Sequence, residues 1–186
     1  HRDASKLNVP LYCLQASDQR AKYRNPHEAH ITHTLLTVPN IHETGKLHGL
    51  LLLHKAMVVR LSDVLAPHCG LVKDKLAKVV QVVLREHDRK RLENSPPGFQ
   101  RFKPQYHATG IWVQLLSYKT SPLSEHITSR WNLPTDSDHF TEQHVSDKAM
   151  ADSMIFIELF NAEFKHDVKI DERSIPVQVQ RWQFPL

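Results

Sequence analysis

Apolar side chains recur every three or four positions between residues 47 and 65, and this repeat constrains the fold of the 186-residue chain more than any other feature. Such spacing gathers apolar side chains into one stripe along a helix. Asn40 is a suitable N-cap, and Pro67 ends the pattern. The stripe consists of Leu47, Leu50, Leu51, His54, Met57, Val58, Leu61, Val64 and Leu65. We therefore predict a long helix between Asn40 and Pro67.

A second apolar stripe with the same spacing follows Gly70. Its members are Val72, Leu76, Val79, Val80, Val83 and His87. The run Asn94–Gly98 contains two prolines and a glycine, which end a helix. The sequence therefore predicts two long helices in succession.

Shorter elements surround the two helices. Ser17 or Asp18 is expected to cap a short helix, and residues 35–38 are long enough for one strand. Residues 110–118 and 153–160 are rich in Ile, Val, Trp and Phe and predict two more strands, and residues 177–182 alternate as a strand does. The order helix, strand, helices, strand, strand predicts an α+β fold of two layers. Its helices would pack on one face of a small mixed sheet.

Charge is divided unevenly along the chain. The net charge of +4 is the sum of +9 over residues 1–119 (18 Lys and Arg, 9 Asp and Glu) and −5 over residues 120–186 (6 against 11). We expect a domain at residues 1–160 that carries an acidic insertion at residues 120–148, followed by a C-terminal extension at residues 161–186. The basic part indicates a polyanionic partner, and the acidic part a different one.

Composition excludes several classes of protein. With 40% hydrophobic and 24% charged residues, the chain is not disordered throughout. Its apolar runs are far shorter than the roughly 20 residues needed to cross a bilayer, so we expect no membrane insertion. Cys13 and Cys69 form no disulfide framework, which indicates a reducing compartment. Because the first residue is His1, we expect a leader that is removed or lies outside the sequence.

Histidine is abundant, with 14 residues, and His27, His30 and His33 are spaced three apart. A turn of helix would bring neighbouring members together, as a metal site requires. A closed zinc site, however, usually recruits cysteines or a second pair of ligands at a defined spacing. Neither cysteine has such a partner, so we predict no metal and no other cofactor.

One segment permits an enzymatic alternative. Residues 42–49, which run into the first predicted helix, look like the helix start of hot-dog acyl-thioesterases, in which a helix N-terminus polarises a thioester carbonyl. His48 would be the residue to test. That fold wraps its helix in five or six strands, whereas few strands are predicted here. We therefore expect no catalytic activity and no small-molecule substrate, with a thioesterase as the minor alternative.

Basic residues gather in an N-terminal arm, at helix ends and before the predicted sheet, an arrangement that attracts phosphate backbones. The candidate residues for this role are Arg2, Lys6, Arg20, Lys22, Arg24, Lys46, Lys73, Lys75, Lys78, Arg101 and Lys103. A single lysine on a helix is usually only solvated surface. The excess of +9 over 119 residues is what favours a nucleic-acid partner.

Four blocks, in chain order, resemble one family. They are residues 17–25 with the upstream Lys6-Leu7-Asn8, residues 37–43, residues 104–115 and residues 151–159. Together they resemble the family of ribosomal protein seventeen of the bacterial-type large subunit. The resemblance implies helices on a small mixed sheet, and contacts with rRNA and neighbouring ribosomal proteins near the tunnel exit. It also implies that Arg20, Lys22 and Arg24 hold RNA phosphates while Arg2 and Lys6 thread between RNA segments, the other candidates being secondary.

The chain departs from that family in ways that indicate a mitochondrial ribosome. The arm has few basic residues, Val113 stands where the family has Arg, and residues 120–148 and 161–186 have no counterpart. Added segments of this kind suit protein contacts, for which Trp131, Phe140 and Trp182 are the expected anchors. The resemblance thus implies a structural protein of the mitochondrial large subunit. The alternative is a scaffold subunit of another mitochondrial complex.

Overall fold

A computed structural model describes residues 2–20, 27–62, 73–116 and 154–186. Within these ranges the chain forms an α+β fold, which confirms the predicted class. The helices are α1 (Arg2–Lys6), α2 (Glu28–Thr37), the short 3-10 helix η1 (Ile41–Thr44) and α3 (Glu86–Glu93). The strands are β1 (Leu11–Gln15), β2 (Ser17–Arg20), β3 (Leu50–Leu53), β4 (Val58–Arg60), β5 (Leu76–Val83), β6 (Arg101–Phe102), β7 (Gly110–Leu115), β8 (Met154–Ile157), β9 (Phe160–Ile170) and β10 (Arg173–Gln183).

The strands form three small sheets. An antiparallel sheet has the order β4-β5-β7-β8, with an irregularity in β5 between Val79 and Gln81. A second sheet has the order β3-β1-β6, in which β1 is antiparallel to β3 and parallel to β6. The third has the order β2-β10-β9, and its two long strands form a hairpin.

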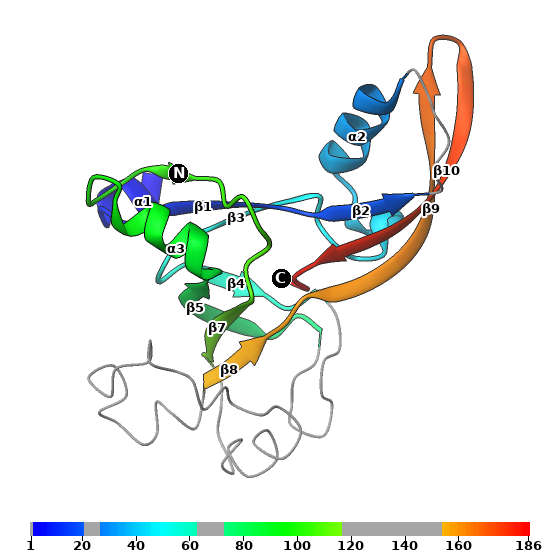
Figure 1. Cartoon of the computed structure of the whole chain (residues 1–186). Coiled ribbons are helices and arrows are strands. Elements are labelled where there is room, and N and C mark those ends of the chain that lie inside the picture. Colours follow the sequence, from blue (N-terminus) through cyan, green and yellow to red (C-terminus); the bar gives the residue numbers. More distant parts are fainter. Residues whose placement is uncertain (1, 21–26, 63–72, 117–153) are drawn as a thin grey trace.

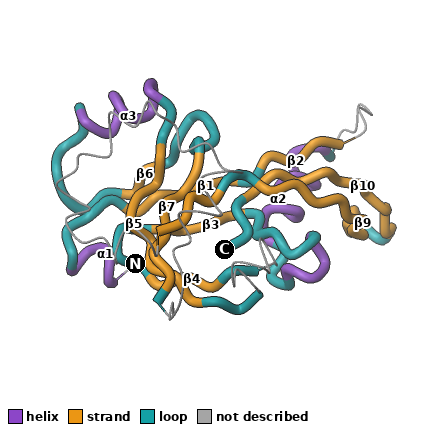
Figure 2. Tube along the Cα trace, turned by 90° about the horizontal axis from the view of Figure 1, so that it is seen from below, coloured by secondary structure: helices purple, strands orange, loops and turns teal. Residues whose placement is uncertain are grey.

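The molecule has two parts (Figure 1). The hairpin lobe comprises β2, α2, η1, β9 and β10, and the sheet body comprises the other elements. Figure 2 shows the same separation after a quarter turn, with α2, β9 and β10 at one end. Only Ala16 separates β1 from β2, and only Glu158 and Leu159 separate β8 from β9. Two nearly continuous strands therefore connect the two parts.

The core of the sheet body is built by strict alternation. In β3, Leu51 and Leu53 are buried while Leu50 and Leu52 are exposed, and Val59 and Leu61 alternate in the same way with Val58 and Arg60. The buried members pack with aliphatic side chains of the four-stranded sheet, which include Val79, Val82, Ile111, Val113, Leu115, Ile155 and Ile157. Phe184 and Leu186 enter the same core, so the C-terminal segment is part of the body.

The core of the hairpin lobe is smaller. Ile31 and Leu35 on one side of α2 pack against Phe164, Val168 and Val179 of the hairpin. The opposite face of the hairpin carries exposed polar side chains, among them Lys165, Asp167, Lys169 and Gln178. Three predicted strands are confirmed. Residues 177–182 lie in β10, and residues 110–118 and 153–160 contain β7 and β8.

The two predicted long helices were wrong, and so was the order of elements built on them. Residues 47–62 form β3, β4 and their connections, and the second stripe becomes β5 followed by the eight-residue α3. Short apolar runs fit both helical and strand spacing, and the β-branched residues of β4 and β5 favour strands. The segment that begins at Ser17 is a strand rather than a helix, and Leu35 lies in α2 rather than in a strand.

Candidate nucleic-acid interface

A cleft of about 470 Å³ lies between η1 and its following loop, β3, β4 and residues 73–74. Buried apolar side chains form its floor, namely those of Leu51, Leu53, Val59, Leu61 and Leu186. The charged and titratable side chains of its lining are Lys46, Arg60, Lys73, Asp74, His42 and His48. Among the described residues, three cationic side chains and one carboxylate therefore surround an apolar floor.

Residues 40–48 form one wall of the cleft, and local hydrogen bonds fix their conformation. The side-chain oxygen of Asn40 accepts the N–H of His42 (3.1 Å) and caps η1. The buried hydroxyl of Thr44 lies 2.8 Å from the carbonyl oxygen of Leu47. Gly45 adopts φ +62°, and a Cβ there would lie 2.6 Å from the Cβ of Ala162 in β9. Only glycine accommodates both this conformation and this approach to the hairpin.

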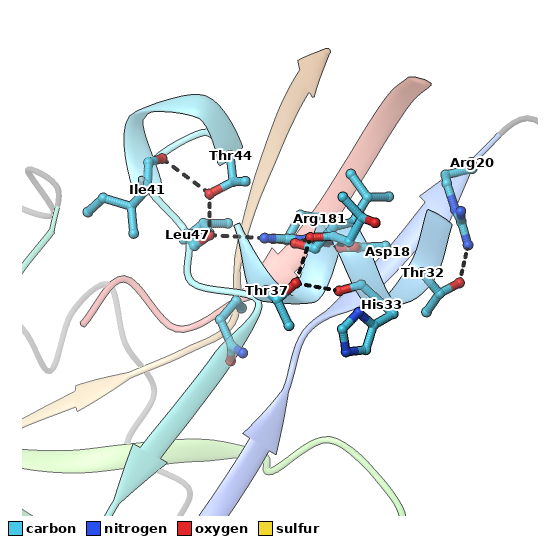
Figure 3. A network of polar contacts seen from close by, with 12 residues as sticks. Asp18, Arg20, Thr32, His33, Thr37, Ile41, Thr44, Leu47 and Arg181 are labelled. Carbon is cyan, nitrogen blue, oxygen red and sulfur yellow. Dashed lines mark hydrogen bonds and ion pairs between the residues drawn. The ribbon is translucent and has the colours of Figure 1, made fainter. Parts of the chain in front are cut away.

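Arg181 of β10 connects this wall with β2 and α2 (Figure 3). Its guanidinium is fully buried and forms two 2.7 Å hydrogen bonds with the carboxylate of Asp18. It also donates to the carbonyl oxygens of Leu35 (2.7 Å) and Leu47 (3.3 Å). Glu43 and His166 add a second link between η1 and β9, with Oε2 and Nδ1 3.5 Å apart. The position of residues 41–48 therefore depends on their contacts with β9 and β10.

The fixed charges of the cleft come from its lysines and arginine. Burial, and then the nearby positive charge of Arg181, lower the pKa of His48, so this imidazole is neutral at pH 7. Arg60 and Asp74 are both exposed, and their charged atoms are 3.7 Å apart, so this pair is weak. Lys46 and Lys73 add two further cationic side chains to the described lining of the cleft. A cationic rim over an apolar floor suits a polyanion that also carries apolar groups.

The structure brings only part of the predicted basic set together. Lys46 and Lys73 line the cleft. Lys75 precedes β5, and the exposed Lys78 is opposite Val58 on the sheet. Lys6 and Arg2 lie in α1, Arg101 lies in β6 and Lys103 follows it. Lys22 and Arg24 lie outside the described residues, as do Trp131 and Phe140.

Arg20, the leading candidate for a phosphate contact, is engaged inside the protein. Its side chain is 14% exposed and pairs with Glu28 of α2. It also donates a 2.8 Å hydrogen bond to the hydroxyl of Thr32. The guanidinium therefore joins β2 to α2 and does not present its charge to solvent. Trp182, an expected protein anchor, is half-buried in β10 opposite Ser17 and Asn161.

The enzymatic and metal alternatives can also be placed. Residues 41–44 form a single turn of 3-10 helix, and β3 follows, so the predicted long helix on which the thioesterase alternative was based is not formed by residues 41–62. His30 and His33 are exposed on α2, and the Nε2 of His30 lies 3.0 Å from the carbonyl oxygen of Lys169. No group of three or more potential metal ligands occurs in the described part of the chain. No helix in that part is long and apolar enough to cross a membrane.

Sequence reasoning missed two arginines that matter here. Arg60 lines the cleft. The alternation in Val58-Val59-Arg60-Leu61 could have predicted its exposure, because every second residue of a strand points to the same face. Arg181 lies in the predicted strand 177–182, but no local pattern marks it as buried. Its partner Asp18 is 163 positions away.

Comparison with known proteins gives no match for this chain, whether with family models, curated proteins or solved structures. The charges and shape of the cleft are therefore the basis for the function proposed next.

Proposed function

We propose that this chain is a non-catalytic nucleic-acid-binding protein whose cleft holds a stretch of sugar–phosphate backbone. The observation that carries the proposal is the meeting of Lys46 and Lys73 in one cleft, together with Arg60. Each cation neutralises a phosphate, and the leucine floor accommodates the apolar parts of the sugars. Such contacts position a nucleic acid without reading its sequence.

The test compares two double variants that remove the same charge. Lys46→Gln/Lys73→Gln changes the cleft, and the control Lys165→Gln/Lys169→Gln changes two exposed lysines of the hairpin. Binding to an RNA oligonucleotide is measured by fluorescence anisotropy at several salt concentrations. The cleft variant should bind more weakly, and its slope of log K against log salt should fall by about 1 per lysine. Equal losses in both variants would mean that net charge alone attracts RNA.

The more specific form of the proposal is a structural constituent of the mitochondrial large ribosomal subunit, in contact with rRNA and neighbouring ribosomal proteins. It is supported by the four sequence blocks alone, because the two long helices are not part of this fold. The full chain should then co-sediment with large-subunit rRNA and be released by nuclease and high salt. If it instead stays in a membrane complex after nuclease treatment, the scaffold alternative is favoured.

A further inference from the structure

A second cavity, of about 250 Å³, lies beside β1 and the loop that follows β6. It is distinct from the cleft: Phe184 lines the cavity, whereas Leu186 lines the cleft. The polar side chains around it are Gln15, Ser17, Lys103, Gln105, Tyr106, His107 and Gln183. None of the described residues that line it is an Asp or a Glu.

The loop on one side of the cavity is held by a buried carboxylate. Asp88 in α3 is fully buried and accepts the backbone N–H groups of Gln105 (2.9 Å) and Tyr106 (2.8 Å). Arg91 also donates to this carboxylate, so its charge is compensated. The His87 ring packs edge-on against the Tyr106 ring, with centroids 5.6 Å apart. Residues 105 and 106 are thus fixed before any ligand arrives.

Lys103 is the one lysine or arginine among the described residues that line the cavity. Lys103 is exposed and has no carboxylate partner among the described residues. Burial, and then the nearby positive charge of Arg85, lower the pKa of His107. His107 is therefore a neutral imidazole at pH 7, able to donate one hydrogen bond without adding a charge.

The remaining polar side chains can each donate hydrogen bonds as well as accept them. Ser17 and Tyr106, which carry hydroxyls, and Gln15 and Gln105, which carry amides, are among the residues that line the cavity. Gln183 is already fixed, because its amide donates to the carbonyl oxygen of Leu14 and its side-chain oxygen accepts the N–H of Phe184. A lining rich in donors, with a cation and without a carboxylate, favours an oxyanion with several acceptor oxygens.

We infer that this cavity binds a phosphoryl group, with Lys103 supplying the charge and Ser17 and Tyr106 supplying hydroxyl hydrogen bonds. The site is separate from the cleft and does not depend on the function proposed for it. The phosphoryl group belongs either to a free phosphate or monoester, or to a phosphodiester of a bound nucleic acid. Both sources offer the same oxygen atoms.

The experiment titrates the full chain with inorganic phosphate and follows binding by isothermal calorimetry. Lys103→Gln should weaken phosphate binding about tenfold, as expected for the loss of one charge-assisted hydrogen bond. Tyr106→Phe removes only a hydroxyl and keeps the ring contact with His87, and it should weaken binding several-fold. Lys165→Gln, which changes an exposed lysine of the hairpin, should bind phosphate as the wild type does. Near-UV circular dichroism checks that each variant is folded.

A second measurement separates the two sources of phosphate. An oligonucleotide without terminal phosphates displaces inorganic phosphate if the site takes a phosphodiester, and fails to displace it if the site takes a free phosphate or monoester. The inference is overturned if the wild type binds no phosphate, if Lys103→Gln and Tyr106→Phe bind it unchanged, or if Lys165→Gln loses as much as Lys103→Gln. The cavity is tested with Lys103→Gln and Tyr106→Phe, and the cleft is tested with RNA and Lys46→Gln/Lys73→Gln, so failure of this site and failure of the nucleic-acid proposal can be told apart.

Discussion

The sheet body and the hairpin lobe differ in what fills their interiors. The body buries an almost entirely aliphatic core drawn from the four-stranded sheet, β3 and the C-terminal segment. The lobe buries a small apolar cluster and, beside it, the ion pair of Arg181 with Asp18. Apolar contacts are non-directional and tolerate exchange of similar side chains. A buried ion pair requires one geometry, so it specifies how β2, α2 and the hairpin meet.

Arg181 does more than neutralise Asp18. One of its donors reaches the carbonyl oxygen of Leu35, which belongs to the last turn of α2, where carbonyls lack partners within the helix. Its guanidinium also lies 5.0 Å from the centroid of the Phe164 ring. One side chain thus holds β10, β2, α2 and the wall of the cleft together. In the body, the buried Asp88 joins fewer elements, because it connects α3 with residues 105 and 106 alone.

The largest expected effect comes from Arg181→Leu. The change leaves the Asp18 carboxylate buried and unpaired and the Leu35 carbonyl without its donor, which should cost about 3–5 kcal/mol. Amides of α2 and β10 should exchange with solvent much faster, while those of β5 and β7 keep most of their protection. Hydrogen exchange measured by mass spectrometry reports the protection of the lobe amides and of the body amides in one experiment.

The double variant Arg181→Leu/Asp18→Leu is the control for this change. It removes both charges and should regain much of the lost stability, because the penalty of an unpaired buried charge disappears. If the double variant is as unstable as the single one, the hydrogen bonds to Leu35 and Leu47 matter more than the charge pair. If Arg181→Leu unfolds both parts together, the distinction between lobe and body is wrong.

Ile111→Ala, which changes the core of the sheet body, is expected to have a smaller effect on stability. Ile111 is fully buried in β7, and its truncation leaves a cavity in the aliphatic core at a cost of about 2–5 kcal/mol. Because β7 is central to the body, the urea midpoint should fall without a change in the slope of the transition. Ile111→Val should cost only about 0.5–1.5 kcal/mol. Loss of protection confined to the hairpin lobe would contradict this assignment.

The smallest effect is expected from Asp88→Asn, which tests a buried carboxylate in the body. The carboxylate oxygens accept two backbone N–H groups and Arg91, and an amide nitrogen would oppose one of these donors. The expected cost is about 1–3 kcal/mol. Arg181→Leu should remain the more damaging change, because Asp88 is held by backbone groups as well as by a cation.

The same carboxylate gives a pH dependence. Burial opposes ionisation of Asp88, but the N–H groups of Gln105 and Tyr106 and the Arg91 guanidinium outweigh it and lower its pKa. Its stabilising contribution is therefore full above the unfolded-state pKa of about 3.9, and it is lost as the pH falls through the lower folded-state pKa. Unfolding measured from pH 6 to pH 2 should show a smaller acid dependence in Asp88→Asn. Identical acid dependence in the two proteins would exclude this role.

Both predicted helices failed for one physical reason. Over short stretches, the leucines and valines of residues 47–65 and 72–87 fit both the 3.6-residue period of a helix and the two-residue period of a strand. Which of the two forms is decided by which side chains become buried in the folded molecule. Leu50 and Leu52 are exposed and Leu51 and Leu53 buried because β1 pairs with this segment, with Leu14 opposite Leu51. The valine-rich segment 79–83 favours a strand, because β-branched side chains have restricted rotamers that suit a strand better than a helix. The prediction gave more weight to the helical spacing of the apolar residues than to this preference for a strand.

The sequence by itself determined the α+β class, the strands that contain Ile111, Ile155 and Val179, and the excess of basic residues in its first two thirds. These follow from local properties: side-chain shape, alternation and the count of charges. Only the tertiary structure decided that Lys46 and Lys73 share a cleft, that Arg20 is engaged internally and that Asp18 meets Arg181. Each of these facts depends on pairing between strands far apart in the chain. Such pairing is selected by burial in the folded molecule, and no local pattern encodes which strand is the partner.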